Sequence, residues 1–156
     1  MANQYGIEPI GTFSNGQTLP DSTTADSTTM VYVGGQSGGA LMISVYARTA
    51  VSIATGQAFN IELEAFTSDA PTSAVSPFSA DNSGSSPTAE NDAHFYLLHK
   101  TSADNPLAFS AGDLITQCGV PFQLLDKLSY DYIQLKYTTD ADESAETVDA
   151  FVHGIL

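Results

Sequence analysis

The sequence is dominated by short runs in which apolar and polar residues alternate, each ended by Gly, Pro, Asn or Asp. A period of two places successive side chains on opposite faces of a β-strand. No window keeps a helical period for more than two turns. The runs lie at residues 30–33, 41–48, 59–66, 94–100, 113–118, 130–138 and 147–155. This pattern predicts an all-β, antiparallel sandwich or barrel.

The run at residues 59–66 (FNIELEAF) shows the alternation most clearly. Glu62 and Glu64 share its polar face. Two carboxylates at this spacing are compatible with a glycosidase-like pair, but an ordinary solvated face explains them better. The apolar faces predicted for three runs are Phe59, Ile61, Leu63 and Ala65; Leu41, Ile43, Val45 and Ala47; and Val148, Ala150 and Val152.

The chain length predicts one sandwich domain, at residues 21–156, preceded by an extended N-terminal arm at residues 1–20. Gly and Pro interrupt the arm, and its apolar residues are irregularly spaced. Such a segment lies either on its own domain or on a partner. The candidate partner-contact residues of the arm are Tyr5, Ile7, Ile10, Phe13 and Leu19.

Two further segments depart from the strand pattern. Residues 68–93 form a long loop rich in Ser, Ala and Pro, and we expect a solvated excursion there. Residues 121–128 (PFQLLDKL) are the best helix candidate, since Pro121 suits a first helical turn.

The charge balance excludes one class of partner. Asp and Glu number 18 against 4 Lys and Arg, for a formal net charge of −14. A nucleic-acid surface needs a basic stripe, and Arg48, Lys100, Lys127 and Lys136 are too few to form one. The same repulsion argues against anionic membranes.

The single cysteine and the N-terminal residues indicate in which cellular compartment the protein is made. Cys118 has no partner for an intrachain disulfide, and we expect a small buried apolar role for it. The first residues have no signal-peptide pattern, and no apolar stretch approaches the ~20 residues of a membrane span. We therefore expect a soluble protein made in a cytoplasm.

Catalytic and cofactor motifs are not evident, so we expect no enzyme, no metal and no cofactor. His94 and His99 would point to opposite sides of one strand, and neither they nor His153 show metal-ligand spacing. Ser37, in GQSG, has no strand-to-helix turn to form a nucleophile elbow. A β-fold enzyme would need a pocket that gathers His94 or His153 with carboxylates from distant strands.

Two binding alternatives remain open. Asp140, Asp142, Ser144 and Glu146 alternate in a loop, but an EF-hand would need glycine at Ala145, so we expect a solvated, dispensable tip with weak Ca²⁺ binding as the alternative. The chain has no Trp for a carbohydrate platform. Six tyrosines, which we expect to pack within the sheets, are the available substitutes: Tyr32, Tyr46, Tyr96, Tyr130, Tyr132 and Tyr137.

The order of segments resembles the jelly-roll capsid cement, or decoration, proteins of tailed bacteriophages, in particular the Bordetella-phage-type cement family. The matching residues are 67–69 (TSD), 111–114 (AGDL), 120–121 (VP), 132–137 (YIQLKY) and 147–152 (TVDAFV). The resemblance covers residues 21 to 156, and the N-terminal arm and the length of the 68–93 loop depart from the family.

The resemblance implies a jelly-roll virion protein without catalysis. It would assemble in the host cytoplasm, form homotrimers, and bind the outer face of an icosahedral shell, where it bridges neighbouring major capsid protein subunits. On this view, deleting residues 1–20 weakens particle binding and leaves the β-fold intact. The alternative is a carbohydrate- or receptor-binding β-sandwich module, such as part of a tail fibre.

Overall fold

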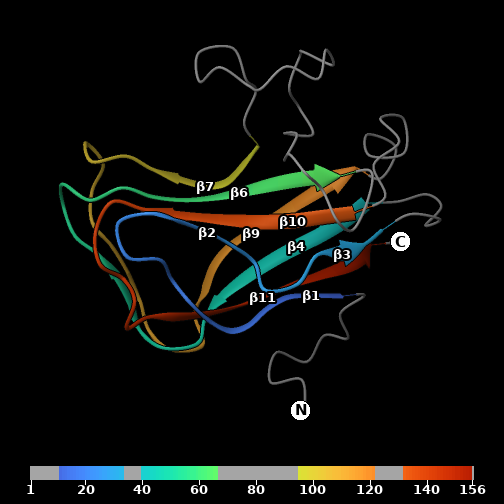
Figure 1. The fold of residues 1–156 in the computed structure, drawn as a ribbon, viewed down its shortest axis with the longest axis horizontal. Coiled ribbons are helices and arrows are strands. Elements are labelled where there is room, and N and C mark those ends of the chain that lie inside the picture. Colours follow the sequence, from blue (N-terminus) through green and yellow to red (C-terminus); the bar gives the residue numbers. More distant parts are fainter. Residues whose placement is uncertain (1–10, 34–39, 67–94, 122–131, 156) are drawn as a thin grey trace.

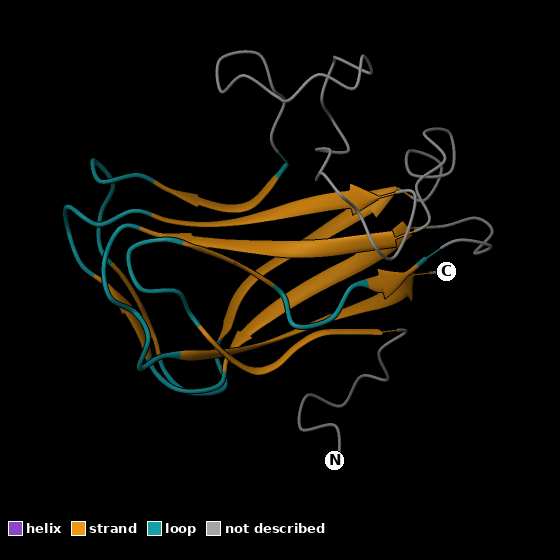
Figure 2. Cartoon of the chain, viewed as in Figure 1, coloured by secondary structure: helices purple, strands orange, loops and turns teal. Residues whose placement is uncertain are grey.

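The computed structural model describes residues 11–33, 40–66, 95–121 and 132–155, and within these ranges the regular structure consists of strands (Figure 2). They form two antiparallel sheets that pack face to face, with a small β-ribbon beside them (Figure 1). The predicted all-β antiparallel sandwich is thus confirmed.

Nine strands form the two main sheets, four in one and five in the other. One sheet has the order β1 (Gly11–Thr18), β11 (Thr147–Ile155), β4 (Ala40–Ala47) and β9 (Leu114–Pro121). The other has the order β2 (Thr24–Asp26), β10 (Tyr132–Thr139), β6 (Phe59–Phe66) and β7 (Tyr96–Lys100), with β3 (Val31–Tyr32) also paired to β10. The ribbon joins β5 (Val51–Ile53) and β8 (Leu107–Phe109).

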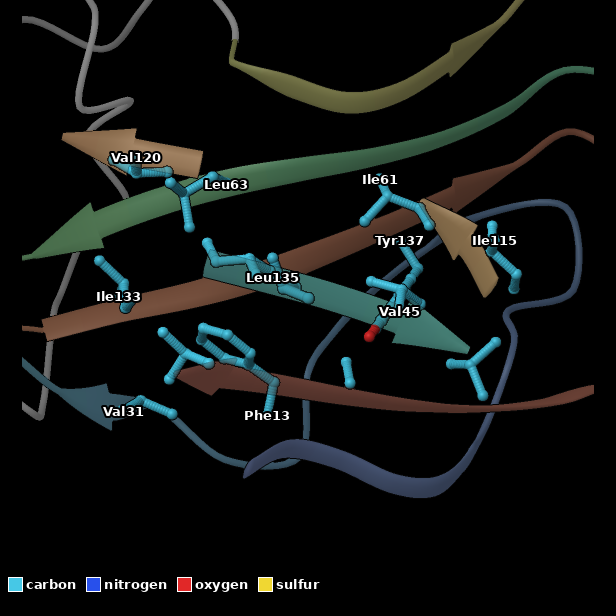
Figure 3. Packing of buried hydrophobic residues seen from close by; sticks show 14 of the residues in the cluster. Phe13, Val31, Val45, Ile61, Leu63, Ile115, Val120, Ile133, Leu135 and Tyr137 are labelled. Atoms are coloured by element: carbon cyan, nitrogen blue, oxygen red, sulfur yellow. The ribbon is translucent and has the colours of Figure 1, made fainter. Parts of the chain in front are cut away.

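Each of the seven predicted runs overlaps a strand, although β4, β9 and β10 extend beyond the predicted bounds. The apolar faces predicted for β4, β6 and β11 are all buried, because they line the inner sides of the two sheets. Figure 3 shows side chains from both sheets meeting between them, among them Val45 of β4, Ile61 of β6 and Ile133 of β10. The alternation of these strands therefore identified the core.

The prediction of an arm over residues 1–20 is wrong for its second half. Residues Gly11–Thr18 form β1, which pairs with β11 at the edge of the sheet. Phe13, seen among the core side chains in Figure 3, is 0% exposed. Leu19 is 2% exposed, so both are core residues of their own domain. Tyr5, Ile7 and Ile10 lie outside the described residues.

The irregularity of β1 explains why its sequence shows no alternation. The register with β11 shifts twice, between Thr12 and Ser14 and between Asn15 and Gln17. Such bulges insert an extra residue and break the period of two. Gly16 has φ of +66°, which glycine adopts without strain. A Cβ there would also lie 2.6 Å from the Arg48 guanidinium.

Two other predicted segments fall mainly outside the description. The helix candidate is wrong at its first residue, because Pro121 ends strand β9, and the rest of that candidate is not described. The 68–93 loop also lies outside the described residues.

The sandwich has two distinct ends. Most of the described loops lie at the left end in Figure 1, and the connection between β2 and β3 is an exception. The strand ends that border undescribed segments lie at the opposite end, where Tyr132 pairs with Phe66 and Tyr32, and Ala40 pairs with Pro121 and Ile155.

Candidate functional site

Three aromatic residues lie side by side on the outer face of the second sheet, the face turned away from the core. We call Tyr32, Tyr132 and Phe66 the aromatic row. Tyr132 of β10 is in register with Tyr32 of β3 and with Phe66 of β6. The Tyr32 and Tyr132 ring centroids are 5.2 Å apart at 59°. Tyr32 is 56% exposed, whereas Phe66 is buried. The row therefore has a solvent-exposed end at Tyr32 and a buried end at Phe66.

The predicted solvated face of β6 is wrong for both of its carboxylates. Glu62 and Glu64 are buried, although they point away from the core. They lie on a strand flanked by β7 and β10, where Tyr96 and Lys136 are both in register with Glu62. Lys136 Nζ donates a hydrogen bond to Glu64 Oε1 over 3.1 Å. The side chains of β7 and β10 explain why Glu62 and Glu64 are buried, which the alternation of β6 alone does not predict.

The pKa values of both partners of this ion pair are raised, but for different reasons. Burial raises the pKa of the Glu64 carboxyl above its ordinary value, and the nearby Lys136 opposes that shift. Burial lowers the pKa of Lys136, but its hydrogen bond to Glu64 and the charges of Glu64, Glu62 and Asp26 outweigh burial, so its pKa is raised. One lysine thus balances three carboxylates, and this part of the face remains anionic.

Replacing Lys136 tests that balance. We expect Lys136→Met to lower the free energy of unfolding by about 1–2 kcal/mol at pH 8, less than for a fully buried pair because its side chain is 32% exposed. The loss should shrink at pH 5, where Glu64 can take a proton. Urea unfolding at both pH values measures it. Glu64→Gln in the same chain should restore most of the stability, and an additive loss in the double variant would contradict the pairing.

A second aromatic contact lies on β7 at the edge of the same face. Tyr96 is 36% exposed and stacks on His99, with ring centroids 4.5 Å apart. His99 Nδ1 lies 2.7 Å from Asn60 Oδ1, which fixes the imidazole orientation if Nδ1 donates. The outer face therefore presents tyrosines at two places, with buried carboxylates between them.

The first sheet contains a serine–histidine pair on its outer face. Ser44 Oγ lies 3.2 Å from His153 Nε2, and Gln117 Nε2 donates to Ser44 Oγ over 2.9 Å. Burial lowers the pKa of His153, and its Nδ1 is buried without a partner. Because Ser44 is fully buried, its hydroxyl is not open to a substrate. His94, the other histidine considered, lies outside the described residues.

The acidic loop at residues 140–146 is exposed at four of its seven residues, as the sequence predicts for a solvated tip, but it also makes contacts with the rest of the fold. Asp140 Oδ1 accepts a hydrogen bond from Ala58 N, and Glu146 Oε1 accepts one from Ser52 N. Glu143 is buried, whereas Asp142 is exposed. The loop therefore joins the ends of β5 and β6. Among the described residues, no group of three or more His, Cys, Asp or Glu is arranged to hold a metal ion.

Glu143 gives this loop a pH dependence. Burial, followed by repulsion from Glu146, raises the pKa of Glu143 to about 7. The folded chain thus keeps a proton that the unfolded chain loses above its ordinary pKa of 4.5, so the contribution to stability is present below pH 4.5 and is lost as pH rises toward 7.

We expect Glu143→Gln to reduce the loss of thermal stability between pH 5 and pH 8. Melting temperatures of wild type and variant at each pH measure it. Asp104→Asn is the matched control, because the pKa of Asp104 is lowered from its ordinary value by hydrogen bonds from Thr101, and Asp104 is not among the carboxylates that raise the pKa of Glu143. An unchanged pH profile in Glu143→Gln would show that another group causes the loss.

The basic side chains of the described chain are held by the fold. Arg48 Nη1 donates to Asn15 Oδ1 and Asp149 Oδ1. Lys100 donates to backbone carbonyls and Lys136 to Glu64. A molecule that binds the described surface therefore contacts mainly carboxylates and neutral groups.

Cys118 differs from its predicted buried role. It is only partly buried, on β9, and Sγ lies 3.6 Å from the Gly119 carbonyl oxygen. Partial burial raises the pKa of the thiol, which disfavours the reactive thiolate.

The described ranges contain no helix with the length and apolar character that a membrane span requires. Comparison with known proteins gave no matching family model and no matching curated protein.

Of the six tyrosines weighed as a sugar platform, Tyr137 is fully buried, and its hydroxyl lies 2.9 Å from Ser14 Oγ between the two sheets. Tyr130 lies outside the described residues. The aromatic row was not predicted, because it depends on the register of three strands that are distant in the sequence.

Proposed function

We propose that this chain is a non-enzymatic virion protein that binds the outer face of an icosahedral shell and bridges neighbouring major capsid protein subunits. It is, in this proposal, a jelly-roll decoration protein of a tailed bacteriophage, assembled in the host cytoplasm and acting as a homotrimer. Binding to the assembled shell, but not to its separated subunits, would stabilise the shell by mass action.

The strand order is the observation that most supports a jelly roll. Counted in chain order without the two-residue β3, the strands of the two sheets are β1, β2, β4, β6, β7, β9, β10 and β11. The first, eighth, third and sixth form one sheet, and the second, seventh, fourth and fifth form the other. This order supports the proposal of a double-sheet jelly roll, an eight-stranded architecture of two Greek keys used by viral capsid and lectin domains.

The positions of the resembling segments give further support. Residues 111–114 lead into β9 and residues 120–121 end it. Residues 132–137 lie in β10 and residues 147–152 in β11. Two of the resembling segments therefore lie in strands central to the sandwich, since β11 pairs with two strands and β10 with three. Residues 67–69 lie outside the described residues.

Charge is consistent with a place on the outside of a shell. The formal net charge of −14 repels a packaged genome and keeps particles from adhering to one another. The three described cations are engaged within the fold, which leaves the exposed surface acidic.

Adding the purified chain to shells assembled from the major capsid protein of the same source tests the proposal. We expect saturable binding at a fixed ratio to the lattice and a higher disassembly temperature. Shells of an unrelated phage are the control. No binding, or binding without a change in disassembly temperature, would contradict a decoration role.

The aromatic row favours one alternative, a carbohydrate- or receptor-binding module. Exposed tyrosines can stack on sugar rings, and Tyr32 and Tyr132 lie next to one another on the outer face. A glycan array probed with wild type and with Tyr32→Ala distinguishes the two functions. Glycan binding that Tyr32→Ala abolishes, together with no binding to shells, would replace the decoration proposal.

A further inference from the structure

The edge strands of the two sheets differ in how far they are protected against pairing with a further strand, and β9 is the least protected. An edge strand presents unpaired backbone N–H and C=O groups, which proteins protect with bulges, short strands or charges. β1 and β9 are the edges of the first sheet. In the second sheet, β7 forms one edge, and β2 and β3 share the other.

Each edge carries at least one of these protections, and those of β9 are confined to its two ends: one register shift near its first residue, between Leu114 and Thr116, and Pro121 at its end. β1 has two register shifts. β7 has a register shift and ends in Lys100, while β2 is three residues long and ends in Asp26. β3 has two residues. A further strand would add poorly to β1, β2, β3 or β7.

β9 has none of the protections along most of its length. Its pairing with β4 is regular from Thr116 to Pro121, and the eight residues LITQCGVP include no charge. Gln117 and Gly119 are exposed, and a Cβ added at Gly119 would meet no atom within 4 Å. Only Pro121, which has no N–H, interrupts the row of donors.

No strand of the described part pairs with the outer side of β9. The nearest element there is β7, which Thr116 reaches through its side chain: Oγ1 donates to Leu97 O over 2.6 Å. This is one hydrogen bond between the two sheets rather than a ladder, so the backbone edge of β9 is not closed by it.

The absence of charged side chains from β9 favours a second copy of the chain as the partner. Two copies, each with a formal net charge of −14, repel wherever carboxylates face each other. An uncharged strand is where two copies can approach without that cost. A strand that pairs antiparallel with its own copy forms a self-complementary, two-fold contact.

We propose that β9 of one copy pairs antiparallel with β9 of a second copy, across a two-fold axis, so that the two four-stranded sheets become one continuous sheet. The contact joins chains in pairs. It does not depend on the decoration role, and it is compatible with a trimer built through another face, in which case it links one trimer to the next.

The test compares the mass of the wild-type chain with that of Gly119→Lys by light scattering and sedimentation over a range of concentrations. Lysine at this exposed edge position places two ammonium groups near the two-fold axis. It also makes the net charge less negative, so weaker association cannot result from greater overall repulsion. Ala108→Lys, at an exposed position on β8, is the control with the same change of charge.

We expect wild type and Ala108→Lys to form even-numbered assemblies at high concentration, with a dimer of twice the 16.4 kDa chain mass as the simplest, and Gly119→Lys to have half that mass. Hydrogen exchange should show that amides of residues 116–120 gain protection with concentration in wild type and Ala108→Lys, and not in Gly119→Lys. Circular dichroism establishes that the variants fold. A wild type that remains monomeric or only trimeric, or a Gly119→Lys assembly of unchanged mass, would overturn the proposal.

Discussion

A chain lacking residues 1–20 is expected not to fold, whereas a chain lacking only residues 1–10 is expected to keep the sandwich. The longer deletion removes β1 and exposes the edge of β11. It also removes Phe13 and Leu19 from the core. Losing one buried large side chain costs about 2–5 kcal/mol, and a whole domain is stabilised by only about 5–15 kcal/mol. The sequence alone suggested that the fold survives deletion of residues 1–20, and the position of β1 leads us to expect the opposite.

Circular dichroism, thermal melting and limited proteolysis of both truncated chains measure this difference. Phe13→Ala in the full chain is an internal control, because it removes one core contact and leaves residues 1–10 in place. A cooperative melt for the chain that starts at residue 21 would contradict the role given to β1.

The same pair of deletions separates folding from partner binding. The predicted tether now rests on Tyr5, Ile7 and Ile10, since Phe13 and Leu19 belong to the core. If residues 1–10 hold the protein on a shell, the chain that starts at residue 11 should fold normally and be lost from particles. Unchanged retention on particles would exclude a tether in these residues.

Lys100→Met is expected to lower the free energy of unfolding by about 2–3 kcal/mol, because a charged donor with several acceptors is lost. Lys100 is 2% exposed. Its Nζ donates to the carbonyl oxygens of Ala54, Gln57 and Thr101, at 3.2, 2.5 and 3.3 Å. These bonds hold the turn between β5 and β6 against the end of β7. Methionine keeps the apolar stem and removes only the ammonium.

The pH dependence of this loss identifies its cause. Backbone carbonyls do not titrate, so Lys100→Met should be equally destabilising at pH 5 and pH 8. Lys136→Met is the matched control, because its partner Glu64 does titrate and its cost should change with pH. Urea unfolding of both variants gives the comparison. A loss below about 0.5 kcal/mol for Lys100→Met would show that water replaces the ammonium without cost.

The sequence predicts strands well where one face is apolar and the ladder is regular. β4, β6 and β11 have this form, and their inner faces are buried as predicted. β1 was missed as a strand because two bulges and Gly16 remove its period of two. Its apolar residues were noticed, but their irregular spacing suggested a partner rather than the core.

The candidate site is harder to predict, because it depends on which strands are neighbours. Nothing in the local sequence places Tyr32 beside Tyr132, which is a hundred positions later. The burial of Glu62 and Glu64 likewise depends on β7 and β10, whose side chains flank them. Alternation shows which way a residue points, whereas strand order determines what covers it.

The central claim is that this chain decorates a shell, and its copy number in purified virus particles tests that claim most directly. Quantitative mass spectrometry against the major capsid protein gives the ratio. A decoration protein that covers the lattice should be present at a ratio of order one to the major capsid protein. A handful of copies per particle would instead indicate a tail or fibre module, and complete absence from particles would contradict the account.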